Sequence, residues 1–359
     1  MARTRRQLPT FLHAPVYAGL RSCLAALGAL PPEGVSAALC AAARAFAGAP
    51  FNRARLARAV ENLGIAFPTW NDAVRHEHAL RAYEHLFLLA AETATLPRKL
   101  TTDGWPRAVE LGPVGSTLER LMRDQPVILI TGHCGNWELL GYTLSVLDFP
   151  VHALYRPLDL KPLNDWVKRS RGRSGLILID KFGAGDNLPE IIGTGGVPAF
   201  VADQNAGDRG LFVPFFGRLA STYKSIGLLA LHANAAVVCG MARRLPGPHA
   251  DGVRYRMETA DVIEPAQWRG QPDPLFYITA RYRRAIEALV RLAPEQYLWM
   301  HRYWKSRPRH ERLGKPFPGA LREKLAQLPW MTPDELERIV DQIDRDSGLI
   351  ARPAAPAST

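Results

Sequence analysis

Short apolar runs alternate with helical stretches in the part of the chain that begins near residue 125. The apolar runs are rich in β-branched residues and cover residues 127–131, 151–155, 176–179, 197–202 and 236–241. Helical spacing marks residues 139–147, 163–171, 223–233 and 274–292. Strands that alternate with helices pack as a mostly parallel sheet flanked by helices. The sequence therefore predicts an α/β fold, and the alternating residues 253–258 predict an antiparallel edge strand.

Residues 14 to about 100 predict helices and no strand. The Ala-rich stretch 35–49 and the apolar spacing within 73–95 both favour packed helices. Before them, three arginines of the first six residues precede a mostly apolar run over residues 8–30, which His13 and Arg21 interrupt. A spanning helix needs about 18 or more apolar residues without interruption. We therefore expect a basic, amphipathic helix at a membrane surface, with an ordinary packed helix as the alternative.

These patterns predict three regions. Residues 1–100 form an N-terminal helical, membrane-associating region, residues 101–312 an α/β domain, and residues 313–359 a C-terminal extension. Within the extension, residues 332–346 predict a short helix that Thr332 and Glu335 begin as a capping box. The last residues, from 351 on, are Ala, Pro, Ser, Thr and one Arg, and we expect them to be disordered.

The charge balance is one-sided. The chain has 45 Lys and Arg against 34 Asp and Glu, a formal net charge of +11. A basic surface favours nucleic acid, an anionic membrane, or an acidic protein or substrate, and composition leaves all three open. Residues 298–305 interleave aromatic side chains with His301, Arg302 and Lys305. This pattern predicts an interfacial, anion-binding helix or a site for single-stranded nucleic acid, although no recognisable nucleic-acid module surrounds it.

The segment PVILITGHCGNWELLGY places His133 directly after an apolar strand and before an apolar helix. Catalytic groups of open α/β sheets lie at the carboxyl ends of strands. A neutral imidazole is a good base near pH 7, and a carboxylate on its second ring nitrogen fixes the tautomer. We therefore hypothesise that His133 takes a proton from a hydroxyl, with Glu138 as the orienting acid. The alternative is a histidine at the edge of the core beside a solvated glutamate.

Two other chemistries at this segment are less favoured. A nucleophilic cysteine and its base are usually neighbours in space and not in sequence, which argues against Cys134 as a nucleophile. No ligand cluster with the usual spacing accompanies His133, so no metal site is predicted. The four cysteines are scattered through the chain without a C-x-x-C pair, which favours a reducing compartment over a disulfide framework.

Polar side chains follow three other predicted strands and point to the same sheet edge as His133. They are Arg156, Asp203, Gln204 and Arg243. An arginine there can bind phosphate or carboxylate through two hydrogen bonds, and the alternative for each is a surface charge. The apolar residues 212–217 predict a loop that lines an acyl channel, dips into lipid or packs in the core.

Several of these segments, taken in order, resemble the lipid A late acyltransferases, a branch of the lysophospholipid acyltransferase superfamily. The matching pieces are VENLGIAFP at 60–68, GHCGNWE at 132–138, YRP at 155–157, DQN at 203–205, FVPFFG at 212–217 and PEQYLWMHRYWKSRP at 294–308. The resemblance covers roughly residues 15–310. It implies a glycerol-3-phosphate acyltransferase-like fold in a bacterial inner-membrane enzyme that moves a fatty acyl chain to a lipid A precursor.

The resemblance also implies roles for individual residues. His133 would be the general base and Glu138 its partner, and the candidate substrate-binding residues are Asn136, Arg156, Asp203, Gln204, Arg243, His301 and Arg302. We expect a thioester of acyl carrier protein or coenzyme A as donor and an anionic lipid as acceptor, at the cytoplasmic face of the inner membrane. No cofactor, metal or nucleic acid is expected. Two alternatives stay open: an acyltransferase for a glycerophospholipid, glycosylated lipid or amino-acid lipid, and a catalytically silent module that binds a membrane or a carrier protein.

Overall fold

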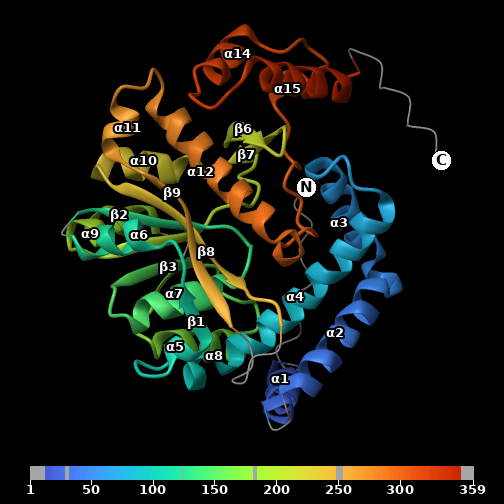
Figure 1. Ribbon diagram of the computed structural model, residues 1–359, viewed down its shortest axis with the longest axis vertical. Coiled ribbons are helices and arrows are strands. Elements are labelled where there is room, and N and C mark those ends of the chain that lie inside the picture. Colours follow the sequence, from blue (N-terminus) through green and yellow to red (C-terminus); the bar gives the residue numbers. More distant parts are fainter. Residues whose placement is uncertain (1–12, 29–31, 124, 181–183, 248–253, 349–359) are drawn as a thin grey trace.

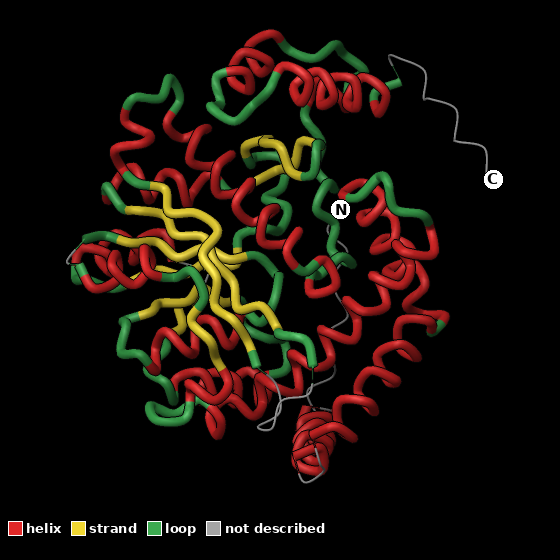
Figure 2. Tube along the Cα trace, in the orientation of Figure 1, coloured by secondary structure: helices red, strands yellow, loops and turns green. Residues whose placement is uncertain are grey.

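A mixed sheet of seven strands forms the centre of the computed structural model, which describes residues 13–28, 32–123, 125–180, 184–247 and 254–348 (Figures 1 and 2). The strands in spatial order are β1 (Val109–Leu111), β9 (Tyr255–Ile263), β8 (Ala236–Arg244), β2 (Val127–Thr131), β5 (Val197–Val201), β3 (Val151–Tyr155) and β4 (Ile177–Asp180). All neighbouring pairs are parallel except β8 and β9. The predicted α/β class with a mostly parallel sheet is confirmed.

Helices cover both faces of this sheet because its central strand is apolar on both sides. All five residues of β2 are buried. Val127 and Leu129 pack with α6 (Gly115–Met122) and α7 (Trp137–Val146), whereas Ile128 and Ile130 belong to the core formed with α10 (Lys224–Ala233) and α12 (Pro274–Leu292). The remaining helices of the α/β part are α5 (Trp105–Ala108), α8 (Lys161–Gly172), α9 (Ala184–Gly193), α11 (Pro265–Arg269) and η3 (Pro294–Gln296).

One strand prediction needs correction. The antiparallel edge strand expected at residues 253–258, the first of which lies outside the described residues, corresponds to β9. This strand is antiparallel to β8, but it is not an edge, because β1 pairs with its other side. The three residues of β1 are too short a run to be recognised as a strand in the sequence.

The described N-terminal residues are helical, as predicted, and lie to one side of the sheet (Figure 1). Their elements are α1 (His13–Gly28), α2 (Pro32–Gly48), η2 (Pro50–Asn52), α3 (Arg53–Ala66) and α4 (Asp72–Lys99). The Arg21 guanidinium lies 5.1 Å from the ring centroid of Trp166 on α8. The basic residues at 3–6 lie outside the described residues. Within the described chain, no single helix passes a length and hydropathy test for a membrane span, but Gly34–Gly48 and Pro50–Ala66, bent by 72°, pass it as a pair.

Two segments expected to be a loop and a helix have other structures. Residues 212–217 belong to a hairpin of β6 (Leu211–Phe215) and β7 (Arg218–Thr222), whose buried Phe215 and Phe216 lie in the core with α12. Residues 298–305 form turns and not the expected helix. Tyr297, Trp299, Tyr303 and Trp304 are all buried there, and such close spacing would place their side chains on several sides of one helix.

The C-terminal extension packs onto the rest of the protein. It contains α13 (Arg309–Arg312), α14 (Gly319–Ala326) and α15 (Pro333–Asp346). The Thr332 hydroxyl accepts a hydrogen bond of 3.2 Å from the Glu335 N–H at the start of α15, which is one half of the predicted capping box. Leu336, Ile339 and Ile343 form the buried stripe of this helix. The tail expected to be disordered, from 351 on, lies outside the described residues.

We predict that Ile343→Ala destabilises the protein by about 2–5 kcal/mol, because it removes a fully buried side chain and leaves a cavity. Chemical denaturation of the purified protein measures this change. Leu313→Ala is the control, since Leu313 is 55% exposed and its truncation should change stability by no more than about 0.5 kcal/mol. Equal stability of Ile343→Ala and wild type would mean that α15 is not part of the folded core.

Candidate active site

The loop of residues 132–136, which we call the His133 loop, connects β2 to α7 and depends on two glycines. A Cβ at Gly132 would lie 2.9 Å from Cγ2 of Ile286, so only glycine allows this close approach to α12. Gly135 has a φ of +58°, and a Cβ there would lie 2.2 Å from the carbonyl oxygen of Ala242. The Leu298 N–H donates to the His133 carbonyl at 3.1 Å. The loop is therefore fixed between α12, the end of β8 and the turn at residue 298.

Sheet register brings His133 and Asp203 together. Thr131 of β2 pairs with Val201 of β5, and each functional residue lies two positions beyond its strand partner. Nδ1 of His133 lies 2.6 Å from Oδ1 of Asp203, and the His133 N–H donates to Oδ2 at 2.9 Å. Because a carboxylate only accepts, Nδ1 carries a proton, and in the neutral imidazole Nε2 is then the acceptor. The Gln204 amide nitrogen lies 3.3 Å from Nε2 and can donate to it.

A buried arginine supports the Asp203 carboxylate. Arg283 of α12 is fully buried, donates through Nη1 to the Asp203 carbonyl oxygen at 2.5 Å and lies 3.7 Å from the ring centroid of Phe215. Burial alone would raise the pKa of Asp203, but the adjacent His133 and Arg283 hold that pKa well below its usual range. Asp203 is therefore a stable carboxylate acceptor for the His133 ring.

Sequence reasoning missed Arg283, although a signal existed. Arg283 lies in the middle of the buried stripe of α12, between Thr279 and Ile286. An arginine at a core position needs a buried partner. Such a position could have been identified as functional from the helical spacing alone.

The expected contact between Glu138 and the His133 ring is not present. Glu138 accepts from Nε of Arg171 at 2.7 Å and also pairs with its Nη2, so its carboxylate faces α8. Glu138 lies in the first turn of α7, where the helix directs its side chain toward α8. The Nδ1 atom of His133 is instead hydrogen-bonded to Asp203. Glu138 still lines the same cavity as His133.

A cavity of about 1020 Å³ has His133 in its lining. Its polar lining residues include Glu138, Arg156, Gln204 and His301, and much of the remaining lining is apolar, from α6, α7 and the strands of the sheet. Ligand pockets usually range from roughly 300 to 1000 Å³. The space therefore suits a long apolar ligand with a reactive end beside His133.

The other predicted substrate-binding residues divide into two groups. Arg156 is exposed at the cavity, and His301 lines it with a pKa lowered by burial, which favours its neutral form. Asn136, Arg243 and Arg302 do not line this cavity. The Asn136 side chain is fully buried behind the loop, Arg243 pairs with Glu258 at 2.8 Å, and Arg302 is exposed on the turn after His301.

The Cys134 side chain is turned away from the cavity and into the core, where it is 1% exposed. Burial raises the pKa of its thiol to about 12, so the nucleophilic thiolate is not formed near neutral pH. Among the described residues, no three His, Cys, Asp or Glu side chains gather as metal ligands. The His133–Asp203 pair is therefore the group best placed for chemistry.

We predict that Asp203→Asn lowers the free energy of unfolding by about 1.5–3 kcal/mol at pH 7, since it removes the carboxylate that accepts from the His133 ring and N–H and that the positive charge of Arg283 stabilises. The folded-state pKa of Asp203 is lowered, so its contribution is complete above the unfolded value of about 3.9 and is lost as the pH falls through the folded value. The difference between wild type and variant should thus shrink below about pH 4.

Urea denaturation at a series of pH values tests this sign. Glu119→Gln is the control, because Glu119 is 71% exposed and forms only a long surface ion pair. Its unfolding should follow that of wild type at every pH. If the free energy of unfolding of Asp203→Asn stays below that of wild type by the same amount from pH 7 to pH 3, the pKa of Asp203 is not lowered in the folded protein.

Comparison with known proteins adds an independent finding. A family model described as bacterial lipid A biosynthesis acyltransferase matches residues 7–306. A lipid A biosynthesis palmitoleoyltransferase of Escherichia coli is 28% identical over 271 residues, which are 72% of this chain and 81% of that protein. A lipid A biosynthesis lauroyltransferase of the same organism is 26% identical over 255 residues, 69% of this chain and 78% of that protein. A lipid A biosynthesis acyltransferase of Haemophilus influenzae is 26% identical over 256 residues, which are 70% of this chain and 76% of that protein.

The match spans the N-terminal helices, the sheet and the turn at residues 298–305, and it includes every residue of the His133–Asp203 site. The chain belongs to the bacterial lipid A biosynthesis acyltransferase family, and it is an acyltransferase.

Proposed function

We propose that the protein transfers a fatty acyl chain from a thioester to a hydroxyl of a lipid A precursor, with His133 as general base. The observation that carries the proposal is the His133 ring at the cavity, with Nδ1 held by the buried Asp203 at 2.6 Å. This arrangement leaves Nε2 as an acceptor that faces the space for substrate. The names of the relatives, which include a palmitoleoyltransferase and a lauroyltransferase of lipid A biosynthesis, support the acyl group and the acceptor.

The reaction needs one base and no covalent enzyme intermediate. Nε2 of His133 takes the proton of the acceptor hydroxyl while its oxygen attacks the thioester carbonyl carbon. The tetrahedral intermediate collapses by breaking the carbon–sulfur bond, and the leaving thiolate takes the proton back from Nε2. Asp203 stays ionised and stabilises the imidazolium formed between these steps. The Gln204 amide, 3.3 Å from Nε2, must give way when the hydroxyl binds.

The apolar part of the cavity accounts for the acyl chain. Leu140 and Leu144 of α7 face Val151 and Leu178 of the sheet across this space. Burial of each methylene contributes about 0.8 kcal/mol, so an acyl chain there is held chiefly by apolar contact. The thioester carbonyl then lies at the polar end, beside His133.

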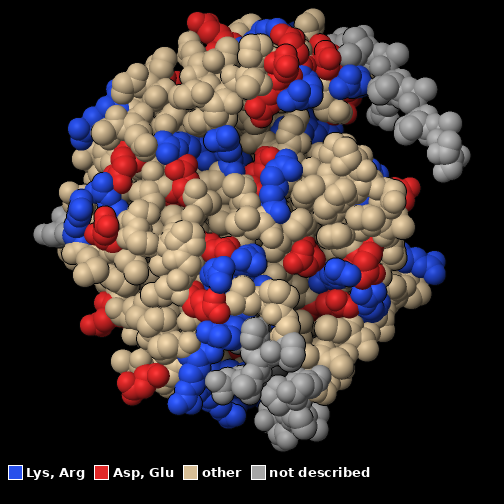
Figure 3. All heavy atoms as spheres, in the orientation of Figure 1, with Lys and Arg blue, Asp and Glu red and all other residues tan. Residues whose placement is uncertain are grey.

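Charge supports an acidic carrier protein as the donor and an anionic lipid as the acceptor. Lys161, Lys168 and Arg169 are exposed on α8, next to the cavity, and Figure 3 has Lys and Arg side chains gathered at the edge where α8 lies. Within the described chain, Arg156 has no carboxylate partner and is free to bind an anionic group at the cavity. A net charge of +11 increases the rate of encounter with both partners.

We place the enzyme at the cytoplasmic face of the bacterial inner membrane, where both the carrier protein and a membrane-bound precursor are accessible. Phe46 at the end of α2 and Phe51 in η2 are 38% and 71% exposed, and Arg53 and Arg55 are exposed beside them. Exposed aromatic side chains next to arginines are typical of surfaces that lie on anionic membranes.

A transfer assay tests the proposed function. Detergent-purified protein is incubated with labelled thioesters of acyl carrier protein or coenzyme A and a tetra-acylated lipid A precursor. We expect wild type to produce a more highly acylated lipid, and His133→Ala to be slower by about 10²- to 10⁴-fold because the base is lost. Asp203→Asn should be impaired more than Glu138→Gln, since Asp203 holds the His133 ring and Glu138 pairs with Arg171.

Each failure of this assay has a distinct meaning. Full turnover by His133→Ala would remove the proposed base. An intact thioester with wild type would exclude this acceptor, and a panel of hydroxylated glycerophospholipids, glycosylated lipids and amino-acid lipids would then identify another. No transfer to any acceptor would favour a module that binds membranes or carrier proteins without catalysis.

We further predict that Gly141→Leu shifts acyl selectivity toward shorter chains. Gly141 of α7 lines the cavity, and a Cβ there would lie 3.7 Å from Leu176, so a larger side chain fits only by filling the space. Mass spectrometry of products from a mixture of C10 to C16 thioesters measures the shift. Gly193→Leu on α9 is the control, since it also replaces a helical glycine with leucine. Gly193 is exposed, and a Cβ there would meet no other atom within 4 Å. Unchanged selectivity of Gly141→Leu would exclude this part of the cavity as the acyl site.

A further inference from the structure

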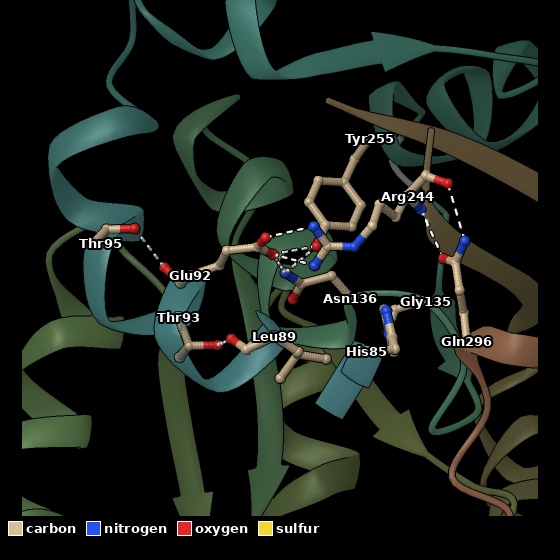
Figure 4. Close-up of polar contacts among 10 residues, drawn as sticks. All are labelled: His85, Leu89, Glu92, Thr93, Thr95, Gly135, Asn136, Arg244, Tyr255 and Gln296. Atoms are coloured by element: carbon tan, nitrogen blue, oxygen red, sulfur yellow. Dashed lines mark hydrogen bonds and ion pairs between the residues drawn. The ribbon is translucent and has the colours of Figure 1, made fainter. Parts of the chain in front are cut away.

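A buried polar cluster lies against the His133 loop (Figure 4), and its residues do not line the cavity. Glu92 of α4 binds the guanidinium of Arg244 through two contacts of 2.6 and 2.7 Å, and the side chains of this pair are only 14% and 15% exposed. The Tyr255 hydroxyl donates to the same carboxylate. Figure 4 shows these three side chains and that of Asn136 pointing toward one another. The cluster thus joins α4, β8 and β9 at one point.

Asn136 connects this cluster to the loop. Its side-chain oxygen accepts from the Leu139 N–H at 2.9 Å and begins α7. This bond directs the amide nitrogen toward the cluster, 3.4 Å from Oε2 of Glu92 and 3.2 Å from the Tyr255 hydroxyl. The Asn136 backbone N–H donates to the Ala242 carbonyl at 2.8 Å. Asn136 is therefore fixed at both its backbone and its side chain.

A second residue of α4 binds the loop seven positions before Glu92. Nε2 of His85 lies 3.0 Å from the Gly135 carbonyl oxygen, and because a carbonyl only accepts, His85 donates. Burial lowers the pKa of His85 to about 3, so this donor is a neutral imidazole with its proton on Nε2. Seven residues span two helical turns, so His85 and Glu92 lie on one face of α4. That face contacts two consecutive residues of the loop, Gly135 and Asn136.

The rest of the cluster holds Arg244 in place. Gln296 accepts from the Arg244 N–H at 2.8 Å and donates to its carbonyl at 3.0 Å, while the Gly135 N–H donates to the Gln296 carbonyl at 3.0 Å. Arg244 also lies 5.0 Å from the ring centroid of Tyr255. A buried ion pair of this kind adds little net stability compared with apolar residues of the same volume. Net stability alone therefore does not account for this buried pair.

We propose that Glu92 and His85 are positioning residues that set the conformation of the His133 loop from α4, and so place the His133 ring for proton transfer. They act through Asn136 and Gly135 and do not touch the substrate cavity. The inference rests on the proposed role of His133 as base. It makes the N-terminal helices part of the catalytic apparatus, because α4 determines where the base lies.

Glu92→Gln is the principal test. Glutamine keeps the size of the side chain but removes the charge that orients Arg244 and Asn136. A displacement of about 1 Å at a reacting group can cost about 100-fold in rate, so we expect kcat to fall by about 10- to 100-fold with KM within about twofold of wild type. Tyr255→Phe is the second variant if Glu92→Gln does not fold. It removes the hydroxyl that donates to Glu92 and accepts from the Asn136 amide, without leaving an unpaired charge, and we expect kcat to fall by about 3- to 10-fold.

Glu77→Gln is the matched control. Glu77 is also a glutamate of α4 paired with arginines, Arg44 and Arg81, but it lies away from the loop. Its kcat should equal that of wild type. In a His133→Ala background, Glu92→Gln should cause no further loss, because a positioning residue has no effect once the group that it positions is absent. A further 10-fold loss in that background, or an equal loss in Glu77→Gln, would overturn the proposal.

A readout without substrate separates this inference from the proposed function. The Nδ1 proton of His133, held by Asp203 at 2.6 Å, should give a downfield proton NMR resonance that His133→Ala abolishes. We expect Glu92→Gln and His85→Ala to shift or broaden this resonance and Glu77→Gln to leave it unchanged. If wild type transfers no acyl chain, the proposed function fails, and the resonance still tests the positioning. An identical resonance in wild type and Glu92→Gln would refute the positioning.

Discussion

The buried carboxylate of Asp203 is the group on which the rest of the site depends. It is fully buried, and a buried carboxylate without partners would be unstable. It therefore requires hydrogen-bond donors and a positive charge nearby. The His133 ring and backbone N–H are the donors, and Arg283 supplies the positive charge. The same contacts that stabilise the charge fix the tautomer of His133. The packing of the core and the orientation of the His133 ring therefore depend on the same contacts.

This requirement explains how the surrounding elements are arranged. β2 and β5 must be adjacent and in register for His133 and Asp203 to meet, and α12 must cross close enough for Arg283 to reach the Asp203 carbonyl. Gly132 permits that closeness, because any Cβ would collide with Ile286. The Arg283 guanidinium in turn rests on the Phe215 ring of the β6–β7 hairpin. The apolar hairpin thus contributes to the site without lining its cavity.

Local periodicity was sufficient for the main strands and helices of the α/β part and for the sheet edge at which His133 lies, but not for β1, the β6–β7 hairpin or the turns at residues 298–305. It was not sufficient for the partner of His133. Glu138 is five residues away in sequence, but the first turn of α7 directs it to Arg171, whereas Asp203 is seventy residues away and reaches the ring through strand pairing. Strand order and register depend on contacts across the whole sheet, so they cannot be predicted from any single segment of the sequence. Arg283 and Glu92 left weaker signals, each a charge within an otherwise apolar helical pattern.

The His133 loop forms a boundary between two environments. On one side lies the cavity, largely apolar and large enough for an acyl chain, and on the other lies the packed polar cluster of Glu92, Arg244 and Tyr255. A loop that faced open space on both sides would lose its conformation each time a substrate entered or left. With one side fixed by α4 and β8, ligand exchange on the other side leaves the position of His133 unchanged. In the proposed mechanism, the N-terminal helices therefore act from behind His133, at a distance from any reacting atom.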